Sequence, residues 1–373
     1  MRFSQRIERL SPSPIREILK VIDQPGMISF AGGLPSAESF PALDCQHLPR
    51  DILQYGPSEG EAGLRARIAD DLTQRGLTVD ADQILVLSGS QQGIDLVAKL
   101  LIDNGTRVAV EMPTYLAALQ VFSLFGANYA GYHATDHSGL ESAAPQLLYT
   151  IPTFQNPTGY CYTDSERRAL AQRADQLGCV LFEDDPYRDL VYSSCDRTPV
   201  CASIKHTSWV YQSSFSKTFA PGLRLGYLAC SKDLYAQLAW LKQAADLHSN
   251  RLSQTLVLHM LSQPDDRLHQ LVQGYREKRD RFQQLLDQTM GQYATWSEPA
   301  GGLFFWLTLK PGLQVDVDTL LQRSLQRNVA FMPGTPFFVE PQSTTCLRLN
   351  FSHASPAQME QGLTVLAELV VKS

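Results

Sequence analysis

Short apolar runs alternate with helical patterns from about residue 60 to residue 230. Continuous apolar strands that alternate with helices are typical of a mostly parallel sheet covered by helices on both faces, because both sides of each strand are buried. Ligands of such sheets bind at the carboxyl ends of the strands, so we expect function in the loops that follow them. The expected strands are Ile84–Leu87, Val108–Val110, Leu147–Ile151, Cys179–Glu183, Trp209–Tyr211 and Leu225–Ala229.

The chain of 373 residues is long enough for two domains. Residues 1–45 are rich in proline, glycine and serine and are predicted to form an N-terminal arm that belongs to the small domain and covers the substrate. Residues 46–260 are expected to form the large domain. A long helical region starts near residue 232, and strands mixed with helices follow it. Residues 261–373 are therefore predicted to form a smaller α+β domain.

Charge and cysteine usage narrow the class of protein. The net charge of −6 comes without any block of like charge, so nothing indicates binding to nucleic acid or to a membrane. No apolar stretch reaches the roughly 18 residues of a membrane-spanning helix, and no signal peptide is recognisable. Seven scattered cysteines without a CxxC pair argue against a metal centre and a disulfide framework. We expect a cytoplasmic protein.

Polar residues follow the first expected strands. The turn Ser88-Gly89-Ser90-Gln91 joins a strand to a helix, where backbone N–H groups at a helix N-terminus can hold a phosphate. Any strand-to-helix turn favours glycine and serine, so an ordinary turn fits as well. Tyr115 follows the next strand and is either a ring that stacks on a planar ligand or a core tyrosine.

The next two strands also end in polar residues. Asn156 lies in Gln155-Asn156-Pro157-Thr158-Gly159, which is either a plain turn or the source of a hydrogen bond to a ligand oxygen. Asp184 and Tyr187 lie in Glu183-Asp184-Asp185-Pro186-Tyr187. Asp184 could hold a proton on a heteroaromatic nitrogen and Tyr187 could bond a phenolic oxygen. A solvated acidic turn is the alternative.

Lys217 and Arg348 are the two cations of interest. Lys217 lies in a run of small hydroxyl residues, seven residues before Arg224. A desolvated amine beside other cations loses its proton more easily, and a neutral amine can form a Schiff base; a solvated lysine is the alternative. Arg348 lies in the apolar strand pattern 346–351 and needs an anionic partner, either a substrate carboxylate or an internal salt bridge.

The motifs occur together and in one order along essentially the whole chain. They are Ser29–Pro35, Tyr55–Gly60, Ser88–Gln92, Ile151–Gly159, Glu183–Tyr187, Ser214–Lys217, Pro221–Arg224, Pro299–Gly302 and Arg348–Phe351. In this combination the sequence resembles the fold-type I, pyridoxal-phosphate (PLP)-dependent aminotransferases of class I/II. Within that family it resembles the branch that contains the 2-aminoadipate and kynurenine aminotransferases. Ser58 and Pro186 depart from the usual pattern without removing a catalytic group.

The resemblance implies a PLP-transferase fold and a role for each motif. Lys217 would form a Schiff base with PLP and then shuttle a proton, Asp184 would pair with the ring nitrogen, and Tyr187 would bond the phenolic oxygen. Arg348 would bind the substrate α-carboxylate. The other residues implied to bind PLP are Gly89, Ser90, Gln91, Tyr115, Asn156, Ser214, Ser216, Arg224 and, from the neighbouring subunit of a homodimer, Tyr55; those implied to bind substrate are Asn156, Gly33 and Arg16.

The implied reaction moves the amino group of an L-amino acid to a 2-oxo acid, expected to be 2-oxoglutarate, by a ping-pong mechanism. Three alternatives stay open: another PLP-dependent reaction such as decarboxylation, lysis or racemisation; a cofactor-sensing regulator; and an inactive interaction protein. Only about 25 residues precede Ile28, too few for the DNA-binding domain of such a regulator, and every catalytic position is filled. The sequence does not show which amino acid is the donor.

Overall fold

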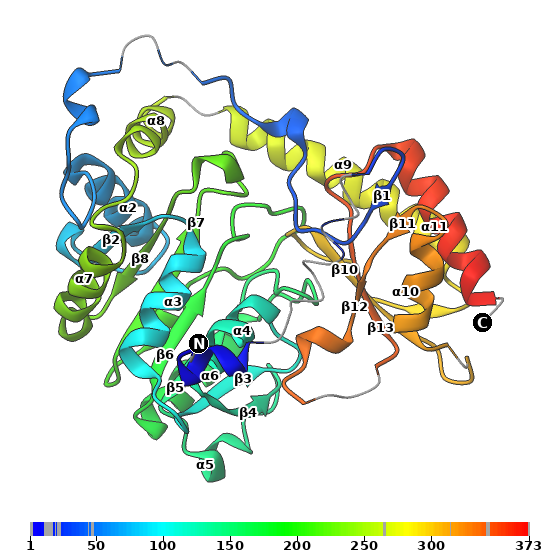
Figure 1. Cartoon of the computed structure of the whole chain (residues 1–373), viewed down its shortest axis with the longest axis horizontal. Coiled ribbons are helices and arrows are strands. Elements are labelled where there is room, and N and C mark those ends of the chain that lie inside the picture. Colours follow the sequence, from blue (N-terminus) through cyan, green and yellow to red (C-terminus); the bar gives the residue numbers. More distant parts are fainter. Residues whose placement is uncertain are drawn as a thin grey trace.

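The computed structural model describes residues 3–10, 18, 20, 24–43, 45, 48–263, 266–313, 315–340 and 344–371. A seven-stranded sheet in the order β2-β8-β7-β6-β5-β3-β4 is the centre of the larger part of the molecule (Figure 1). β8 is antiparallel to both its neighbours, and the other neighbouring strands are parallel. The predicted mostly parallel sheet is thereby confirmed. Its strands are β2 (Ile84–Leu87), β3 (Arg107–Glu111), β4 (Asn128–Tyr132), β5 (Leu147–Thr150), β6 (Val180–Asp184), β7 (Trp209–Ser214) and β8 (Gly226–Cys230).

Helices cover both faces of this sheet because alternate side chains of each strand point to opposite sides. Leu85 and Leu87 of β2 belong to an apolar cluster with α3, α4 and α7. Ile84 and Val86 of the same strand belong to a second cluster with α2, α6 and α8. The helices of this part are α2 (Ala62–Gln74), α3 (Ser90–Leu101), α4 (Leu116–Phe125), α5 (Leu140–Ala143), α6 (Asp164–Leu177), α7 (Lys232–Asp246) and α8 (Arg251–Leu261).

The helix boundaries follow local chemistry. Thr163 caps α6 by accepting a hydrogen bond from the backbone N–H of Glu166, and Gly178 ends the helix at a φ of 63°. The helical region expected from residue 232 is divided, because Asn250 caps a new helix, α8. Strand β4 was not expected from the sequence. Its residues are mostly half-buried or exposed, so it lacks the continuous apolar pattern of the central strands.

The smaller part contains a four-stranded sheet in the order β12-β13-β10-β9, packed against helices in its own apolar cluster. β1 of the predicted arm pairs in parallel with β11, so Ile28 and Ser29 lie beside Val329 and Ala330. The predicted domain boundaries stay a prediction. The elements here are β1 (Ile28–Ser29), α9 (Asp266–Thr289), β9 (Ala294–Thr295), β10 (Phe304–Leu309), α10 (Val317–Leu325), β11 (Val329–Ala330), β12 (Met332–Pro333), β13 (Cys346–Asn350) and α11 (Pro356–Val371).

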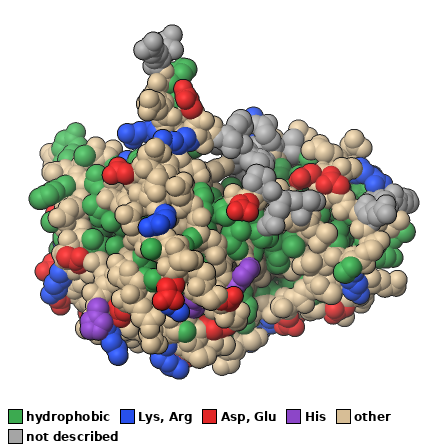
Figure 2. All heavy atoms as spheres, turned by 90° about the horizontal axis from the view of Figure 1, so that it is seen from below, with side chains coloured by type: hydrophobic (Ala, Val, Ile, Leu, Met, Phe, Trp, Pro, Cys, Tyr) green, Lys and Arg blue, Asp and Glu red, His purple; other side chains and the backbone are tan. Residues whose placement is uncertain are grey.

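The face of the molecule drawn in Figure 2 carries no large patch of a single charge. Figure 2 shows basic and acidic side chains interspersed over that face, with no large area of one sign. Among the residues that the structure describes, no helix is long and apolar enough to cross a membrane.

Candidate active site

A cavity of about 260 Å³ lies where the strands β5, β6 and β7 end and where α3 and α4 begin. The carboxyl ends of parallel strands meet at one edge of a sheet, which is why motifs far apart in the sequence converge here. Of its lining residues, only Ile151 and Pro186 were not among the predicted site residues. The lining residues are Ser90, Gln91, Tyr115, Ile151, Asn156, Asp184, Pro186, Tyr187, Ser214, Ser216, Lys217 and Arg224.

One end of the cavity is built to receive an anion. Gly89 directly precedes α3 and has a φ of 87°, a conformation that side chains disfavour. A Cβ atom at Gly89 would lie only 2.4 Å from Nη2 of Arg224, so glycine is needed for this close approach. Arg224 thus lies against the N-terminus of α3, and Ser214 lines the same cavity as both. Ser214 and Ser216 are linked by a hydrogen bond of 2.9 Å between their hydroxyls.

Asp184 is a buried carboxylate with one oxygen left open. Its Oδ2 accepts a hydrogen bond of 2.8 Å from the hydroxyl of Tyr149. Its Oδ1 has no hydrogen-bond partner among the described residues. Burial raises the pKa of Asp184 to about 6, and the bond from Tyr149 opposes that rise. A buried acceptor without a partner is costly, so this oxygen suits a donor on a bound ligand.

The neighbouring acids correct one of the alternatives from the sequence. Glu183, Asp184 and Asp185 are all buried, so a solvated acidic turn is wrong. Asp185 forms an ion pair of 3.3 Å with Arg188 and accepts a bond of 3.0 Å from Tyr211. Of these three acids, Asp184 alone lines the cavity.

Lys217 extends from the loop after β7 into the same cavity. Its Nζ donates a hydrogen bond of 2.8 Å to the carbonyl oxygen of Gly33 and lies 6.0 Å from the centre of the Tyr187 ring. Burial, together with the charges of Arg348 and Arg224, lowers the pKa of Lys217 to about 8. A much larger fraction of this amine is therefore neutral near neutral pH than for an exposed lysine.

Arg348 of β13 is a buried cation that has no anionic partner in the part of the chain that the structure describes. Its Nη1 donates to Oδ1 of Asn156 at 2.7 Å, and its Nη2 donates to the carbonyl oxygen of Ala31 at 2.6 Å. No carboxylate in the described part of the chain forms an ion pair with it, and its Nε has no partner there. Burial lowers the pKa of Arg348 to about 10. The predicted alternative of an internal salt bridge is thus not found among these residues.

Of the remaining predicted residues, Tyr115 and Tyr187 line the cavity. Tyr115 donates a hydrogen bond of 3.4 Å to Gln91, and burial raises the pKa of its hydroxyl to about 12. Tyr187 is buried and packs edge to face on Phe304 with ring centres 5.7 Å apart. Tyr55 is not among the residues that line the cavity of its own chain, and it is 76% exposed. Arg16 lies outside the described residues.

Tyr149 is a site residue that the sequence did not reveal. It lies in the middle of the apolar strand β5 and is fully buried, which from sequence looks like an ordinary core position. Its aromatic neighbours Phe122 and Phe182 both have ring centres at 5.4 Å, and they fix the ring while the hydroxyl reaches Asp184. Only the pairing of β5 with β6 could have indicated this contact.

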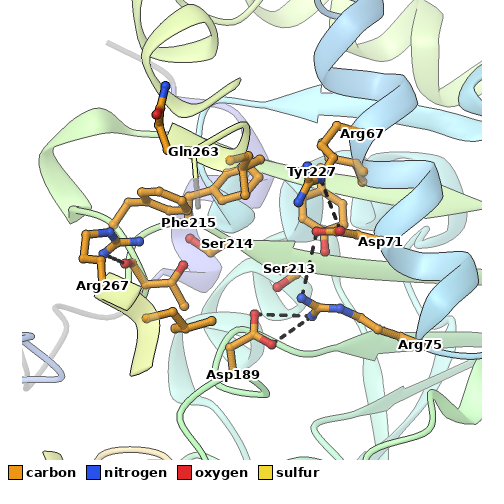
Figure 3. A pocket seen from close by; sticks show the side chains of 15 residues that line it. Arg67, Asp71, Arg75, Asp189, Ser213, Ser214, Phe215, Tyr227, Gln263 and Arg267 are labelled. Atoms are coloured by element: carbon orange, nitrogen blue, oxygen red, sulfur yellow. Dashed lines mark hydrogen bonds and ion pairs between the residues drawn. The ribbon is translucent and has the colours of Figure 1, made fainter. Parts of the chain in front are cut away.

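A larger cavity of about 340 Å³ lies behind the Ser213–Ser214 segment (Figure 3). Most of its charged side chains pair with one another, and Arg267 donates to the carbonyl oxygen of Thr218 at 2.6 Å. Arg75 lies 3.0 Å from Asp189, and Arg67 lies 3.3 Å from Asp71. The first pair links the end of α2 to the loop after β6 and the second lies within α2, so we interpret both as structural. The smaller cavity remains the candidate active site because Lys217 and Asp184 both line it, and Oδ1 of Asp184 has no hydrogen-bond partner among the described residues.

These features fit PLP, which carries a phosphate, a ring nitrogen that can be protonated and an aldehyde. The phosphate suits the end of the cavity beside Gly89 and Arg224, and the protonated nitrogen suits Oδ1 of Asp184, which has no partner among the described residues. The aldehyde suits an amine whose pKa is lowered, as that of Lys217 is. In the described residues no group of three or more His, Cys, Asp or Glu side chains could hold a metal ion.

Comparison with known proteins gives the same answer. The model of the family "Aminotransferase class I and II" matches residues 34–366. A 2-aminoadipate transaminase of Thermus thermophilus is 35% identical over an alignment of 381 positions, gaps included, that covers 97% of this chain and 94% of that protein.

Two solved structures are also similar over almost the whole chain. LysN, the α-aminoadipate aminotransferase of Thermus thermophilus complexed with N-(5′-phosphopyridoxyl)-L-leucine, has a TM-score of 0.90 at 34% identity, covering 99% of this chain and 97% of that one. The kynurenine aminotransferase of Pyrococcus horikoshii has a TM-score of 0.89 at 30% identity, again covering 99% and 97%.

The resemblance deduced from the sequence motifs is confirmed by these matches. They favour transamination over the other PLP-dependent reactions that the sequence left open. This chain belongs to the class I and II aminotransferases and is a PLP-dependent transaminase.

Proposed function

We propose that this transaminase uses Lys217 as its catalytic amine, Asp184 as the partner of the PLP ring nitrogen and Arg348 as the anchor of the substrate α-carboxylate. The observation that carries the proposal is the set of unpaired charges. A buried carboxylate oxygen and an amine with a lowered pKa share one cavity, and the buried guanidinium bonds its wall at Asn156. Buried charged groups of this kind destabilise the protein unless a bound ligand supplies the missing partner.

The phosphate of PLP would be held by the N-terminus of α3 and the side chains around it. Backbone N–H groups at a helix N-terminus favour an anion, and a guanidinium adds a charge-assisted bond. Tyr115 would stack on the ring, and Asn156 and Tyr187 would bond its phenolic oxygen. The residues proposed for the phosphate are Gly89, Ser90, Gln91, Ser214, Ser216 and Arg224.

PLP, when bound, supplies an electrophilic carbon that accepts an amino group and a conjugated ring that takes up an electron pair. Lys217 would hold the cofactor, and its amine would be free to act as a base once a substrate amine is bound. Its neutral Nζ would remove the proton from the substrate Cα, hold it as an ammonium and release it to the electrophilic carbon of the cofactor. A pKa of about 8 keeps this amine able both to accept and to release a proton near neutral pH.

Asp184 and Arg348 set the charge and the orientation around this proton transfer. An ionised Asp184 would hold a proton on the ring nitrogen of the cofactor, and the positive charge there would favour uptake of the electron pair that deprotonation of Cα releases. Tyr149 helps to keep Asp184 ionised, since its hydrogen bond opposes the effect of burial on the Asp184 pKa. Arg348 fixes the substrate carboxylate, which orients the Cα–H bond toward Lys217.

For the substrates, we propose an L-amino acid of the branch resembled here as donor and 2-oxoglutarate as acceptor. The relatives named for 2-aminoadipate and kynurenine support this choice. The test incubates the purified protein with 2-oxoglutarate and, in turn, 2-aminoadipate, kynurenine, aromatic amino acids and leucine. We expect one or two of these donors to form glutamate at least about 100-fold faster than the poorest donor. A difference of this size is expected when the site fits one kind of side chain better than the others. Release of CO₂ or inversion at Cα without glutamate would contradict the proposal.

The active unit is proposed to be a homodimer in which Tyr55 reaches the PLP phosphate of the partner. The surface around Tyr55 supports this, because its large apolar side chains are unusually exposed. Leu53 is 82% exposed, Tyr55 is 76% exposed, and Leu247 and Leu252 on the adjoining segment are 41% and 40% exposed. The ring centres of Tyr55 and His248 lie 5.8 Å apart, which joins the two segments into one patch. Exposed apolar patches mark protein interfaces.

Mixing two inactive variants tests the shared site. A mixed dimer of Lys217→Ala and Tyr55→Ala chains contains one site with an intact lysine and an intact Tyr55 from the other chain. Refolding the two variants together is therefore expected to restore activity well above the sum of the separate variants. Purely additive activity, or a monomer in sedimentation analysis, would contradict the shared site.

We also propose a cytoplasmic location. All seven cysteines are free, which supports a reducing compartment. Detection of the protein in a secreted or periplasmic fraction of its own cell would exclude this location.

A further inference from the structure

A network of charged and polar groups lies behind the turn that is proposed to hold the PLP phosphate. Its centre is Asp246, the last residue of α7. Oδ2 of Asp246 accepts hydrogen bonds of 2.8 Å from the hydroxyl of Ser88 and of 2.8 Å from the side-chain amide of Gln92. Oδ1 forms an ion pair with Nζ of Lys242, whose side chain is fully buried. The carboxylate is therefore bonded to both α7 and the start of α3.

Every polar group of Ser88 is engaged by this network or by Arg224. Its backbone N–H donates to Oε1 of Gln92 at 2.9 Å, and its hydroxyl donates to Asp246. Its carbonyl oxygen accepts a bond of 3.4 Å from Nη2 of Arg224. Since Gly89 follows directly at a φ of 87°, fixing Ser88 fixes the direction of the next N–H groups.

The position of Asp246 is unfavourable by local rules. A carboxylate at the C-terminus of a helix is repelled by the negative end of the helix dipole. The next residue, Leu247, has φ 64° and ψ −60°, which is strained for a side chain that is not glycine. Asp246 is thus repelled by the helix dipole and is followed by a residue with a strained backbone. Strain of this kind is typically kept where the surrounding structure uses it.

We propose that Asp246 is a positioning residue for PLP: it aims the Ser88–Gln91 turn at the phosphate and is held in place by the buried ammonium of Lys242. This inference rests on the proposed function, because it assumes that the turn binds the phosphate. Asp246 does not line the cavity, so it acts through Ser88 and Gln92. The carboxylate stays ionised near neutral pH, because its bonds to Lys242, Gln92 and Ser88 hold its pKa below the usual value in spite of partial burial.

The test compares cofactors with and without the phosphate. Asp246→Asn and Ser88→Ala are made, cofactor is removed, and the binding of PLP and of pyridoxal is titrated by absorbance. Hydrogen bonds to a charged group contribute about 1.5–3 kcal/mol, so we expect the PLP dissociation constant to rise by roughly 10- to 100-fold. The pyridoxal dissociation constant should change less than about twofold, because pyridoxal lacks the phosphate that the turn holds.

A matched control removes a similar pair on the adjacent helix. Asp95 of α3 pairs with Lys99 at 2.5 Å, four residues later, and its side chain is 33% exposed. Asp95→Asn should leave the binding of both cofactors unchanged. Ser88→Ala guards against a folding defect, because it removes the bond to the turn and leaves the pair between Lys242 and Asp246 intact.

The outcomes separate this inference from the function on which it rests. Equal loss of PLP and pyridoxal binding in the variants would show a general structural role and would overturn the proposal. Unchanged PLP binding would overturn it too. If the wild-type protein itself binds pyridoxal as tightly as PLP, the assignment of the turn to the phosphate fails first.

Discussion

Replacing Lys217 by alanine is expected to reduce the rate of amino-group transfer by about 10,000-fold, the upper range for losing a positioned acid–base group. The variant loses the only lysine amine that lines the cavity among the described residues. With the roles proposed for Lys217, the variant would lose both the covalent attachment of PLP and the group that moves the Cα proton. The rate is measured in single-turnover experiments with protein saturated with PLP, using the best donor from the substrate panel.

Borohydride reduction provides a second readout for Lys217. After reduction, mass spectrometry should find the cofactor attached to the wild-type chain at Lys217 and find none attached to the variant. Lys310→Ala is the matched control, because Lys310 also donates to a glycine carbonyl, that of Gly291 at 2.8 Å, but does not line the cavity. A Lys217→Ala variant that keeps the wild-type rate would falsify the assignment.

Replacing Arg348 by alanine is expected to raise KM for the amino donor by about 30-fold or more. Truncating one partner of a buried charge pair typically costs about 2–5 kcal/mol, and the substrate carboxylate would be the other partner. Lysine keeps the charge but not the planar fork, so Arg348→Lys should lie between the wild type and the alanine variant. Steady-state kinetics with the three proteins give KM and kcat separately.

Arg348 also has structural bonds, so the experiment must separate the two effects. Its bonds to Asn156 and to the Ala31 carbonyl would be lost in the alanine variant as well. PLP affinity and the thermal midpoint are measured in parallel to detect such damage. An amine that lacks the α-carboxylate of the amino donor should react equally slowly with the wild type and with the alanine variant. A variant whose preference for the amino acid over this amine matches the wild type would remove Arg348 from the carboxylate role.

The sheet and the convergence of its loops could be predicted from the sequence because strand ends carry a local signal. Small and polar residues such as Gly89 and Asn156 interrupt apolar runs, and parallel strands bring their carboxyl ends together. Strand β4 could not be predicted, since an edge strand that is half exposed has no continuous apolar run.

The supporting residues of the site could not be predicted for a different reason. Tyr149 lies in an apolar strand, and Asp246 lies at the end of an amphipathic helix, so each looks ordinary in its own segment. Their roles arise from partners 35 and 158 residues away in the chain, at Asp184 and Ser88. Local patterns carry no information about such partners. Tyr55 is a further case, because its proposed role needs a second copy of the chain.

The pairing of β1 with β11 determines when the site can be completed during synthesis. A ribosome makes the chain from its N-terminus at about 5–20 residues per second, and early segments can fold as they emerge. The segment that carries Gly33 is made early, but its partners Val329 and Ala330 are made almost 300 residues later. The Phe30 carbonyl also waits for the N–H of Asn350. The segment that carries the carbonyl bound by Lys217 is therefore secured only after residues 329 and 330 have been made, so a nascent chain stalled before residue 329 would carry Lys217 without the strand that holds this segment.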